Sequence, residues 1–201
     1  MKVLVVGATG TIGESVSTLF EEHGHSVTRV GHQNGDYTVD LGSKDSIRAL
    51  FEEIGQVDTV VSTAGVANFA PLKDLTDVDF QLALNNKLMG QVNLVRVGSE
   101  HVNDNGSITL TSGLLAREPM PGSAAISMAN GGLESFTKAA AQELEPRIRV
   151  NVVSPVFVKE TMEIMGMDST NGVSASDTAK AYLAAIQGNN NGDTLDVRDY
   201  V

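Results

Sequence analysis

The sequence predicts an α/β protein, a parallel sheet doubly wound by helices into three αβα layers and forming a single domain. Short β-branched runs that end in Gly, Ser or Asp alternate with longer segments whose apolar residues recur every three or four positions. Such alternation implies βαβ units and a parallel sheet. All 201 residues fit one domain, because no linker or internal repeat divides residues 1–201 and the length is ordinary for a single core. A helical bundle is the structural alternative, and the β-branched runs argue against it.

The first half of the chain is expected to contribute three strands and three helices. The strands are Lys2–Val6, Ser26–Gly31 and Val57–Ser62. Apolar periodicity places helices from Ile12 to His23, from Ile47 to Ile54 and from Asp77 to about Val102. Gly24 follows the first helix, where a left-handed glycine commonly ends a helix.

The second half repeats the alternation. Strands are expected at Gly106–Thr111, Ile148–Val153 and Thr194–Val197, and helices at Ser123–Glu145, Lys159–Gly166 and Ser174–Gln187. The Asn189–Gly192 run has the composition of a turn and leads into the final strand.

Composition excludes several classes of partner. The net charge of −11 argues against a nucleic-acid binder, since such proteins gather Lys and Arg on one face. The leading apolar run is too short for a signal peptide, and no stretch approaches the roughly 20 apolar residues of a membrane helix. There is no cysteine, and the four histidines show no ligand spacing. We therefore expect a cytoplasmic protein with no metal, no nucleic-acid partner and no membrane partner.

The turn after the first strand carries the strongest chemical signal. It reads Gly7-Ala8-Thr9-Gly10-Thr11-Ile12-Gly13, a G-x-x-G-x-x-G spacing between a strand and a helix. Glycines there permit a tight turn, close approach of a pyrophosphate and close helix packing, as in Rossmann-type sites. Free amides and the helix dipole favour the diphosphate. The residues expected to bind it are Gly7, Thr9, Gly10, Thr11, Ile12 and Gly13.

The end of the second strand bears on which dinucleotide is bound. NAD-binding proteins usually place an acidic residue about 20 positions past the glycine turn, at the end of the second strand. In this sequence no acidic residue occurs from the start of the second strand at Ser26 until Asp36. His32, with Gln33 and Asn34, could instead receive a 2′-phosphate, and Arg29 is close in sequence. The expected cofactor is NADP, with NAD as the alternative.

In addition to the glycine turn, six segments resemble the short-chain dehydrogenase/reductase family, in order and over nearly the whole chain. Asp40-Leu41 is similar to the pair that holds the adenine ring, and Thr63-Ala64-Gly65 to the Asn-Ala-Gly turn of the family. Ile108–Ser112 looks like the strand that carries the catalytic serine. The other similar segments are Leu133–Thr137, Arg149–Pro155 and Gly192–Val197. The resemblance implies a Rossmann-type fold and adds Asp40, Leu41, Ala64, Gly65 and Pro155 to the expected cofactor-binding residues.

The sequence differs from the family at the positions of the catalytic residues. Alignment puts Ile126 at the position of the catalytic tyrosine and Asn130 at that of the lysine, and no Tyr-x-x-x-Lys occurs anywhere. The family's helical asparagine falls on Lys87. Isoleucine cannot donate a proton, so the familiar relay is absent. Asn130 can still hydrogen-bond a ribose.

The catalytic hypothesis rests on Ser112 and Lys87. If Lys87 points from the long helix toward Ser112, it returns a cation to the site and can stabilise an oxyanion while Ser112 donates a hydrogen bond. The expected function is an NADP-dependent oxidoreductase that acts on a small carbonyl or alcohol with altered acid chemistry. The alternative for Lys87 is a structural or solvated lysine. The missing tyrosine favours a second function class, a non-catalytic dinucleotide-binding sensor or scaffold, while Ser112 and the complete glycine turn favour the enzyme. A nucleotide-sugar epimerase-like enzyme ranks last, because it needs the same tyrosine.

A small molecule is the expected substrate, and the chain itself the expected protein partner. The helix from Asp77 carries more apolar residues than one narrow face can hold, and Ser123–Glu145 is rich in Ala and Gly. In the resembling family the two corresponding helices commonly form a dimer interface. A homodimer or homotetramer is therefore expected.

Overall fold

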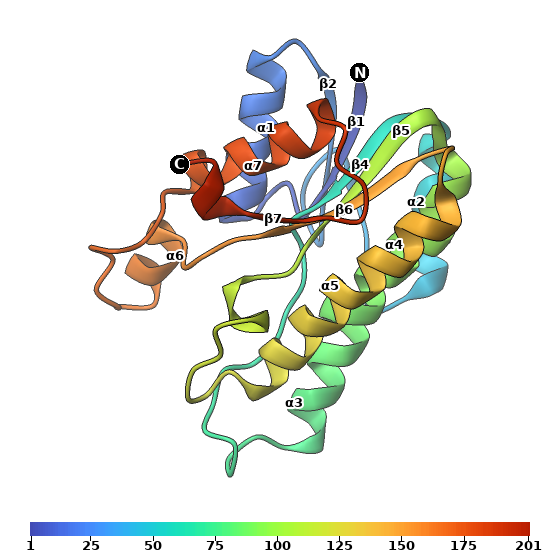
Figure 1. Cartoon of the computed structure of the whole chain (residues 1–201). Coiled ribbons are helices and arrows are strands. Elements are labelled where there is room, and N and C mark those ends of the chain that lie inside the picture. Colours follow the sequence, from blue (N-terminus) through green and yellow to red (C-terminus); the bar gives the residue numbers. More distant parts are fainter.

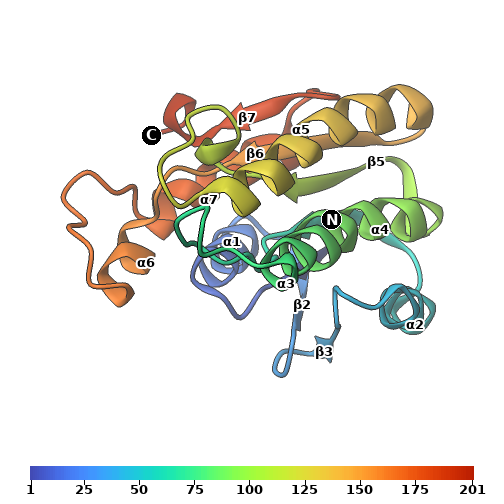
Figure 2. The same ribbon diagram turned by 90° about the horizontal axis from the view of Figure 1, so that it is seen from below.

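The computed structural model describes residues 1–201 and contains seven strands. They are β1 (Lys2–Val6), β2 (Ser26–Gly31), β3 (Tyr37–Thr38), β4 (Val57–Ser62), β5 (Val102–Thr111), β6 (Arg149–Ser154) and β7 (Thr194–Asp196). All pair in parallel, in the order β3-β2-β1-β4-β5-β6-β7. Figure 2 shows β3 and β7 at opposite edges. The expected doubly wound, three-layer fold is confirmed.

The main helices cover both faces of the sheet. They are α1 (Thr11–Glu22), α2 (Lys44–Ile54), α3 (Asp77–Leu82), α4 (Met89–Gly98), α5 (Ala124–Leu144), α6 (Lys159–Ile164) and α7 (Ala175–Gln187). Figure 1 shows α1 beside α7 on one side, and α2, α4 and α5 on the other. Two apolar cores match these layers: one joins the sheet to α2, α4 and α5, and the other joins it to α1 and α7. None of the helices is both long and apolar enough to cross a membrane.

The predicted helix from Asp77 to Val102 is wrong in detail. The structure divides it into α3, a π-helical turn η1 (Ala83–Leu88), α4 and a 3₁₀ turn η2 (Ser99–His101), after which β5 begins at Val102. Thr76 begins α3 with a capping box, in which its hydroxyl and the Asp79 carboxylate each accept a backbone N–H. The π-helical turn includes Lys87, and π-turns within helices often occur at functional sites.

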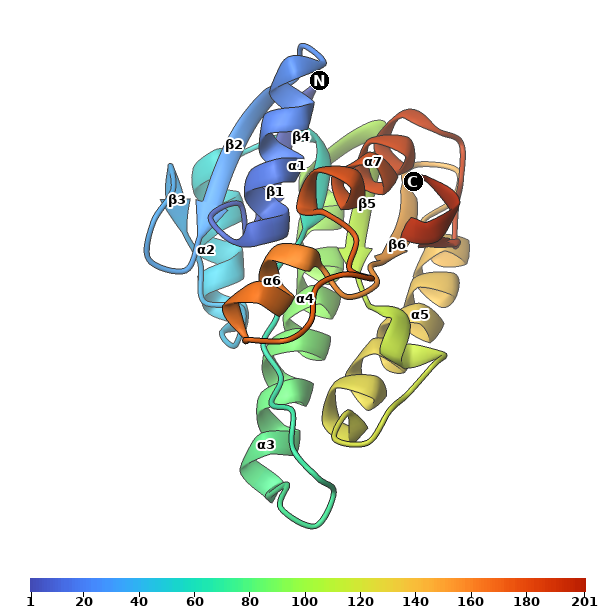
Figure 3. The ribbon, with the colours of Figure 1, turned by 90° about the vertical axis from the view of Figure 1, so that its left-hand side faces the viewer.

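The order of the strands locates the functional crevice. The chain runs outward from β1 to β2 and β3 on one side, and from β1 to β4 and beyond on the other. Ligands of doubly wound sheets bind at such a switch point, beyond the carboxyl ends of the strands. Figure 3 shows α3, α6 and the start of α5 extending past these ends.

Candidate cofactor and substrate site

The glycine turn has the backbone geometry that a diphosphate requires. Gly7 has φ +88°, a left-handed conformation. A Cβ atom on Gly13 would lie 2.0 Å from the carbonyl oxygen of Gly7, so the helix packs on the turn too closely for any side chain. No side chain caps α1, and the amides of Thr11, Ile12 and Gly13 have no acceptor. These donors, at the positive end of a 12-residue helix, fit the phosphates of a dinucleotide.

Thr63 ties the end of β4 to this turn. Its hydroxyl donates to the carbonyl oxygens of Val6 (3.2 Å) and Gly7 (3.1 Å). A threonine in place of the family's asparagine therefore still joins two neighbouring strand ends. Ala64 and Gly65 follow it along the wall of the crevice.

A first cavity of about 310 Å³ lies over the carboxyl ends of β1, β2 and β4. Seven of the expected cofactor-binding residues line it: Gly7, Thr9, Gly10, His32, Leu41, Ala64 and Gly65. Asp40 is not among its lining residues, and its carboxylate accepts the amide of Gly42 at 2.8 Å. Asn86, which the sequence analysis missed, lines the cavity and accepts the Val66 amide at 2.9 Å.

The end of β2 narrows the choice of groups for a 2′-phosphate. Arg29 is paired with Glu21 of α1 (2.9 Å), and its amide donates to Asp36. The suggestion that Arg29 receives the phosphate therefore has no support in this structure, since its guanidinium already has a partner. His32 remains exposed at the mouth of the cavity, and its Nδ1 lies 3.4 Å from the carbonyl oxygen of Val39.

A second cavity, also of about 310 Å³, adjoins the first, and Thr63 and Gly65 line both. It lies past the ends of β5 and β6. The remaining expected residues that line it are Ile12, Lys87, Ser112, Asn130 and Pro155. Its other walls are mainly apolar and include Leu114, Leu115, Ile126, Phe157 and Val158. The first cavity thus opens beside a second space of small-molecule size.

Lys87 does point from its helix toward Ser112. Its side chain, 7% exposed, comes from the π-helical turn η1 and packs against Gly65. Nζ donates to the carbonyl oxygens of Thr111 (3.5 Å) and Ser112 (3.4 Å), both long contacts. Burial lowers the pKa of Lys87 to about 8, because the charged form loses water. The lysine is therefore neither solvated nor paired, and is still mostly charged at neutral pH.

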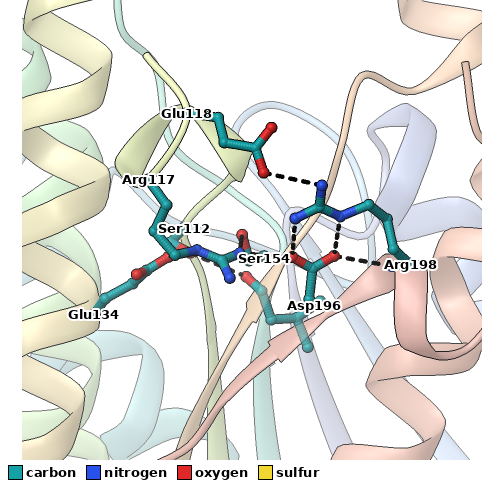
Figure 4. Close-up of polar contacts among 8 residues, drawn as sticks. Ser112, Arg117, Glu118, Glu134, Ser154, Asp196 and Arg198 are labelled. Atoms are coloured by element: carbon teal, nitrogen blue, oxygen red, sulfur yellow. Dashed lines mark hydrogen bonds and ion pairs between the residues drawn. The ribbon is translucent and has the colours of Figure 1, made fainter.

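Ser112 faces a different set of groups. Its hydroxyl donates to Glu134 of α5 at 3.0 Å, so Lys87 reaches the main chain of Ser112 and not its side chain. Figure 4 shows Ser112 and Glu134 beside Arg117, which also binds Ser154 and Asp196. Arg198 in turn pairs with Asp196 and Glu118. The sequence analysis missed this network, because its members are far apart along the chain.

Asn130 lies on α5 and is 1% exposed. No hydrogen-bond partner is present for its buried Oδ1. A Cβ atom on Gly113 would lie 3.0 Å from its Nδ2, so the absence of a side chain at Gly113 makes room for the amide. Buried polar atoms without partners are rare in folded proteins, and this one belongs to a residue in the wall of the second cavity.

Comparison with known proteins agrees with the fold. Residues 3–197 match the sequence profile described as enoyl-(acyl carrier protein) reductase. The crystal structure of the protein lin1944 from Listeria innocua has 37% sequence identity and a TM-score of 0.93, over 98% of this chain and 99% of that one. A small-chain dehydrogenase in complex with NADPH has 31% identity and a TM-score of 0.87, over 98% and 95% of the two chains.

A curated relative, an uncharacterized oxidoreductase of Methylorubrum extorquens, is 27% identical over 167 residues. The alignment covers 83% of this chain and 65% of that protein, so the chain spans less than two thirds of the relative's length. Together with the profile match, the comparisons show that the chain belongs to the short-chain dehydrogenase/reductase family of oxidoreductases.

Proposed function

We propose that the protein is an NADP-dependent oxidoreductase that transfers a hydride between the nicotinamide ring and a small carbonyl or alcohol. The observation that carries the proposal is the join between the two cavities at Thr63 and Gly65. One cavity has the cradle for a dinucleotide, and the other has a buried ammonium group, Lys87, in its wall. The NADPH complex of a similar dehydrogenase supports the choice of cofactor.

The preference for NADP over NAD rests on the end of β2. Gly31 is followed by His32, Gln33 and Asn34, and none of these carries a carboxylate that would repel a 2′-phosphate or bind ribose hydroxyls. A Cβ atom on Gly31 would lie 2.8 Å from the Thr9 hydroxyl, so glycine there keeps the two loops close together. We assign the 2′-phosphate to His32 and Thr9 and to nearby main-chain donors.

Lys87 is the residue we assign to proton transfer. When bound, the nicotinamide supplies or accepts the hydride. In the reductive direction, the protonated Lys87 Nζ stabilises the oxygen that becomes negative and donates a proton to it, leaving a neutral amine that solvent reprotonates. Ile126 cannot take this role. Ser112 would have to release Glu134 before its hydroxyl could reach a substrate, so we give it the lesser, hydrogen-bonding role.

The positions of Lys87 and Asn130 support this assignment. Lys87 stands where the family has an asparagine, and Asn130 stands where the family has a lysine. Both side chains are buried in the wall of the same cavity. The cavity wall therefore still contains one amide and one ammonium group, but each comes from the helix that carries the other in the family. Asn130, with its amide free, is then placed to bind the nicotinamide ribose.

The test has two stages. NADPH and NADH are first titrated against the protein, and NADPH oxidation is then followed with a panel of carbonyl compounds. We expect tighter binding of NADPH and oxidation that Lys87→Met abolishes, while the exchanged double variant Lys87→Asn/Asn130→Lys regains part of the rate. Full activity in Lys87→Met would exclude the assigned role.

The missing tyrosine favours a second function, a non-catalytic NADP-binding sensor or scaffold. Ile126 leaves the tyrosine position without a proton donor. Tight NADPH binding with no oxidation against any carbonyl compound would select this alternative.

A further inference from the structure

The second cavity contains a buried cation that has no counterion. None of the carboxylates in the structure pairs with Lys87, since every ion pair involves other residues. No Asp or Glu lines the cavity. Buried charges in proteins are normally paired, and the protein as a whole carries a net charge of −11. An unpaired buried ammonium group is therefore a local exception in an acidic molecule.

The protein also satisfies the hydrogen bonds of this ammonium group poorly. Its two acceptors are carbonyl oxygens at 3.4 and 3.5 Å, and one of them, the carbonyl of Thr111, already accepts a 2.9 Å bond from Gln91. Charge-assisted N–H···O bonds are normally about 2.7–2.9 Å long. Lys87 has three N–H donors, so its capacity to bind an oxygen anion is largely unused.

A second polar group in the same wall lacks a partner. Asn130 is 1% exposed, and its Oδ1 has no hydrogen-bond donor. The remaining lining is mainly apolar and carries no second charge. A small, mainly apolar space with one cation is complementary to a short molecule with a negative end and a small alkyl group. The free Oδ1 of Asn130 is an acceptor, so its complement is a hydroxyl donor, such as that of a ribose or of a 2-hydroxy acid, and not the carboxylate.

We propose that the substrate is a short 2-oxo acid, or the matching 2-hydroxy acid, whose carboxylate binds Lys87. A 2-oxo acid places its ketone oxygen beside a carboxylate oxygen, so one ammonium group can contact both. In reduction, the ketone carbon gains the hydride and the ketone oxygen gains the Lys87 proton, while the carboxylate remains an anion throughout. The proposal rests on the proposed function for the reaction step, and its binding step can be tested separately.

The test compares an acid with its neutral amide. Binding of 2-oxobutanoate and of 2-oxobutanamide is measured by calorimetry, with and without saturating NADP⁺, which has no hydride to give. We expect the acid to bind the unmodified protein at least about tenfold more tightly than the amide, the usual scale of a charge-assisted contact. In Lys87→Met, whose folding is checked by circular dichroism, this preference should disappear.

Asn130→Asp is the second variant, because it keeps the size of the side chain and adds an anion to the wall. Measured without NADP⁺, it should weaken binding of the acid at least about tenfold more than it weakens binding of the amide. The proposal is overturned if the acid and the amide bind equally, if the acid does not bind in either state, if the preference survives in Lys87→Met, or if Asn130→Asp binds the acid as the unmodified protein does.

The two proposals fail in different ways. Lys87-dependent reduction of uncharged carbonyl compounds, with no preference for acids, would keep the proposed function and overturn the 2-oxo acid. Lys87-dependent binding of the acid with no oxidation of NADPH would support the ligand class and reject the hydride transfer.

Discussion

The guanidinium of Arg117 lies 2.9 Å from the carboxylate of Asp196 and so joins the loop after β5 to the last strand of the sheet. Arg117 also lies 3.6 Å from Glu134, which accepts the Ser112 hydroxyl. The loop that follows Ser112 includes Leu114 and Leu115, which line the second cavity. The shape of the proposed substrate site therefore depends on the ion pair between Arg117 and Asp196, which are far apart in the sequence.

We expect Arg117→Met to lower the free energy of unfolding by about 1 kcal/mol near neutral pH, a small value because the arginine side chain is 39% exposed. Hydrogen bonds from Arg198 and then from Arg117 hold the pKa of Asp196 at about 2, below its usual 3.8. This stabilisation is present above pH 3.8 and is lost as the pH falls toward 2. Urea denaturation at pH 7 and at pH 2 measures it. Arg117→Lys should lose less than Arg117→Met, and an equal loss for Arg117→Met at both pH values would contradict the ion-pair account.

Gly13→Ala tests the dinucleotide cradle. The added Cβ atom would lie 2.0 Å from the carbonyl oxygen of Gly7, so either the turn or the helix must move. We expect NADPH binding to weaken at least about tenfold and the free energy of unfolding to fall by about 2 kcal/mol. Fluorescence titration and thermal melting provide the two measurements.

Gly131→Ala is the matched control for that variant. It also adds a methyl group at a helical glycine, but nothing lies within 4 Å of the new atom. It should leave NADPH affinity unchanged and raise stability slightly, since alanine favours helix. Equal losses of binding in Gly13→Ala and Gly131→Ala would show that the effect of Gly13 is not local.

The sequence was sufficient to predict the layers of the fold, because buried parallel strands and amphipathic helices have different apolar periods. Gly24 is left-handed at the end of α1, as predicted. The two-residue strand β3 was missed, since two residues carry no period. The start of β5 was also misplaced, because Val102–Gly106 includes polar residues that resemble a loop, and the register with β4 shifts there.

Only part of the candidate site could be predicted from the sequence. Adjacent residues such as Gly7–Gly13 form their turn locally, so the pattern was enough to predict its geometry and to propose its role. The approach of Lys87 to Ser112 was a hypothesis from the aligned strand and helix, and the structure brings Lys87 to the main chain of Ser112. The partner of the Ser112 hydroxyl did not, because Glu134 lies 22 positions away on another element and nothing in the local pattern links them. The ion pair between Arg29 and Glu21 could not be predicted either, because the two residues lie on different elements.

We expect the protein to form a homodimer or homotetramer through the α3–α4 segment and α5. Val78 of α3 is 71% exposed, and Met89 and Met128 also expose large apolar side chains on these elements. Burial of such surface between subunits would remove it from water. Sedimentation velocity at micromolar concentration should give a dimer or a larger species, and Met89→Glu with Met128→Glu should shift it toward monomer. A monomer in the unmodified protein would refute the prediction.

The buried Lys87 predicts two opposite responses to pH. Its pKa is about 8 in the folded protein, against 10.5 for an ordinary lysine, because burial removes water from the charged form. Between pH 8 and 10.5 the unfolded chain binds more protons at this lysine than the folded protein does. The free energy of unfolding should therefore rise with pH over this range, by up to the order of 3 kcal/mol. Reduction should instead fall above pH 8, because the proton donor is lost.

Unfolding and NADPH oxidation can both be followed between about pH 7.5 and 9.5, below the pKa of Tyr182, which burial raises. In the unmodified protein, the free energy of unfolding should rise with pH over this range while the rate of NADPH oxidation falls. In Lys87→Met, the free energy of unfolding should change much less with pH. Activity that increases steadily through pH 9 would show that protonated Lys87 is not the acid. A flat stability profile in the unmodified protein would show that its charge is not held out of water.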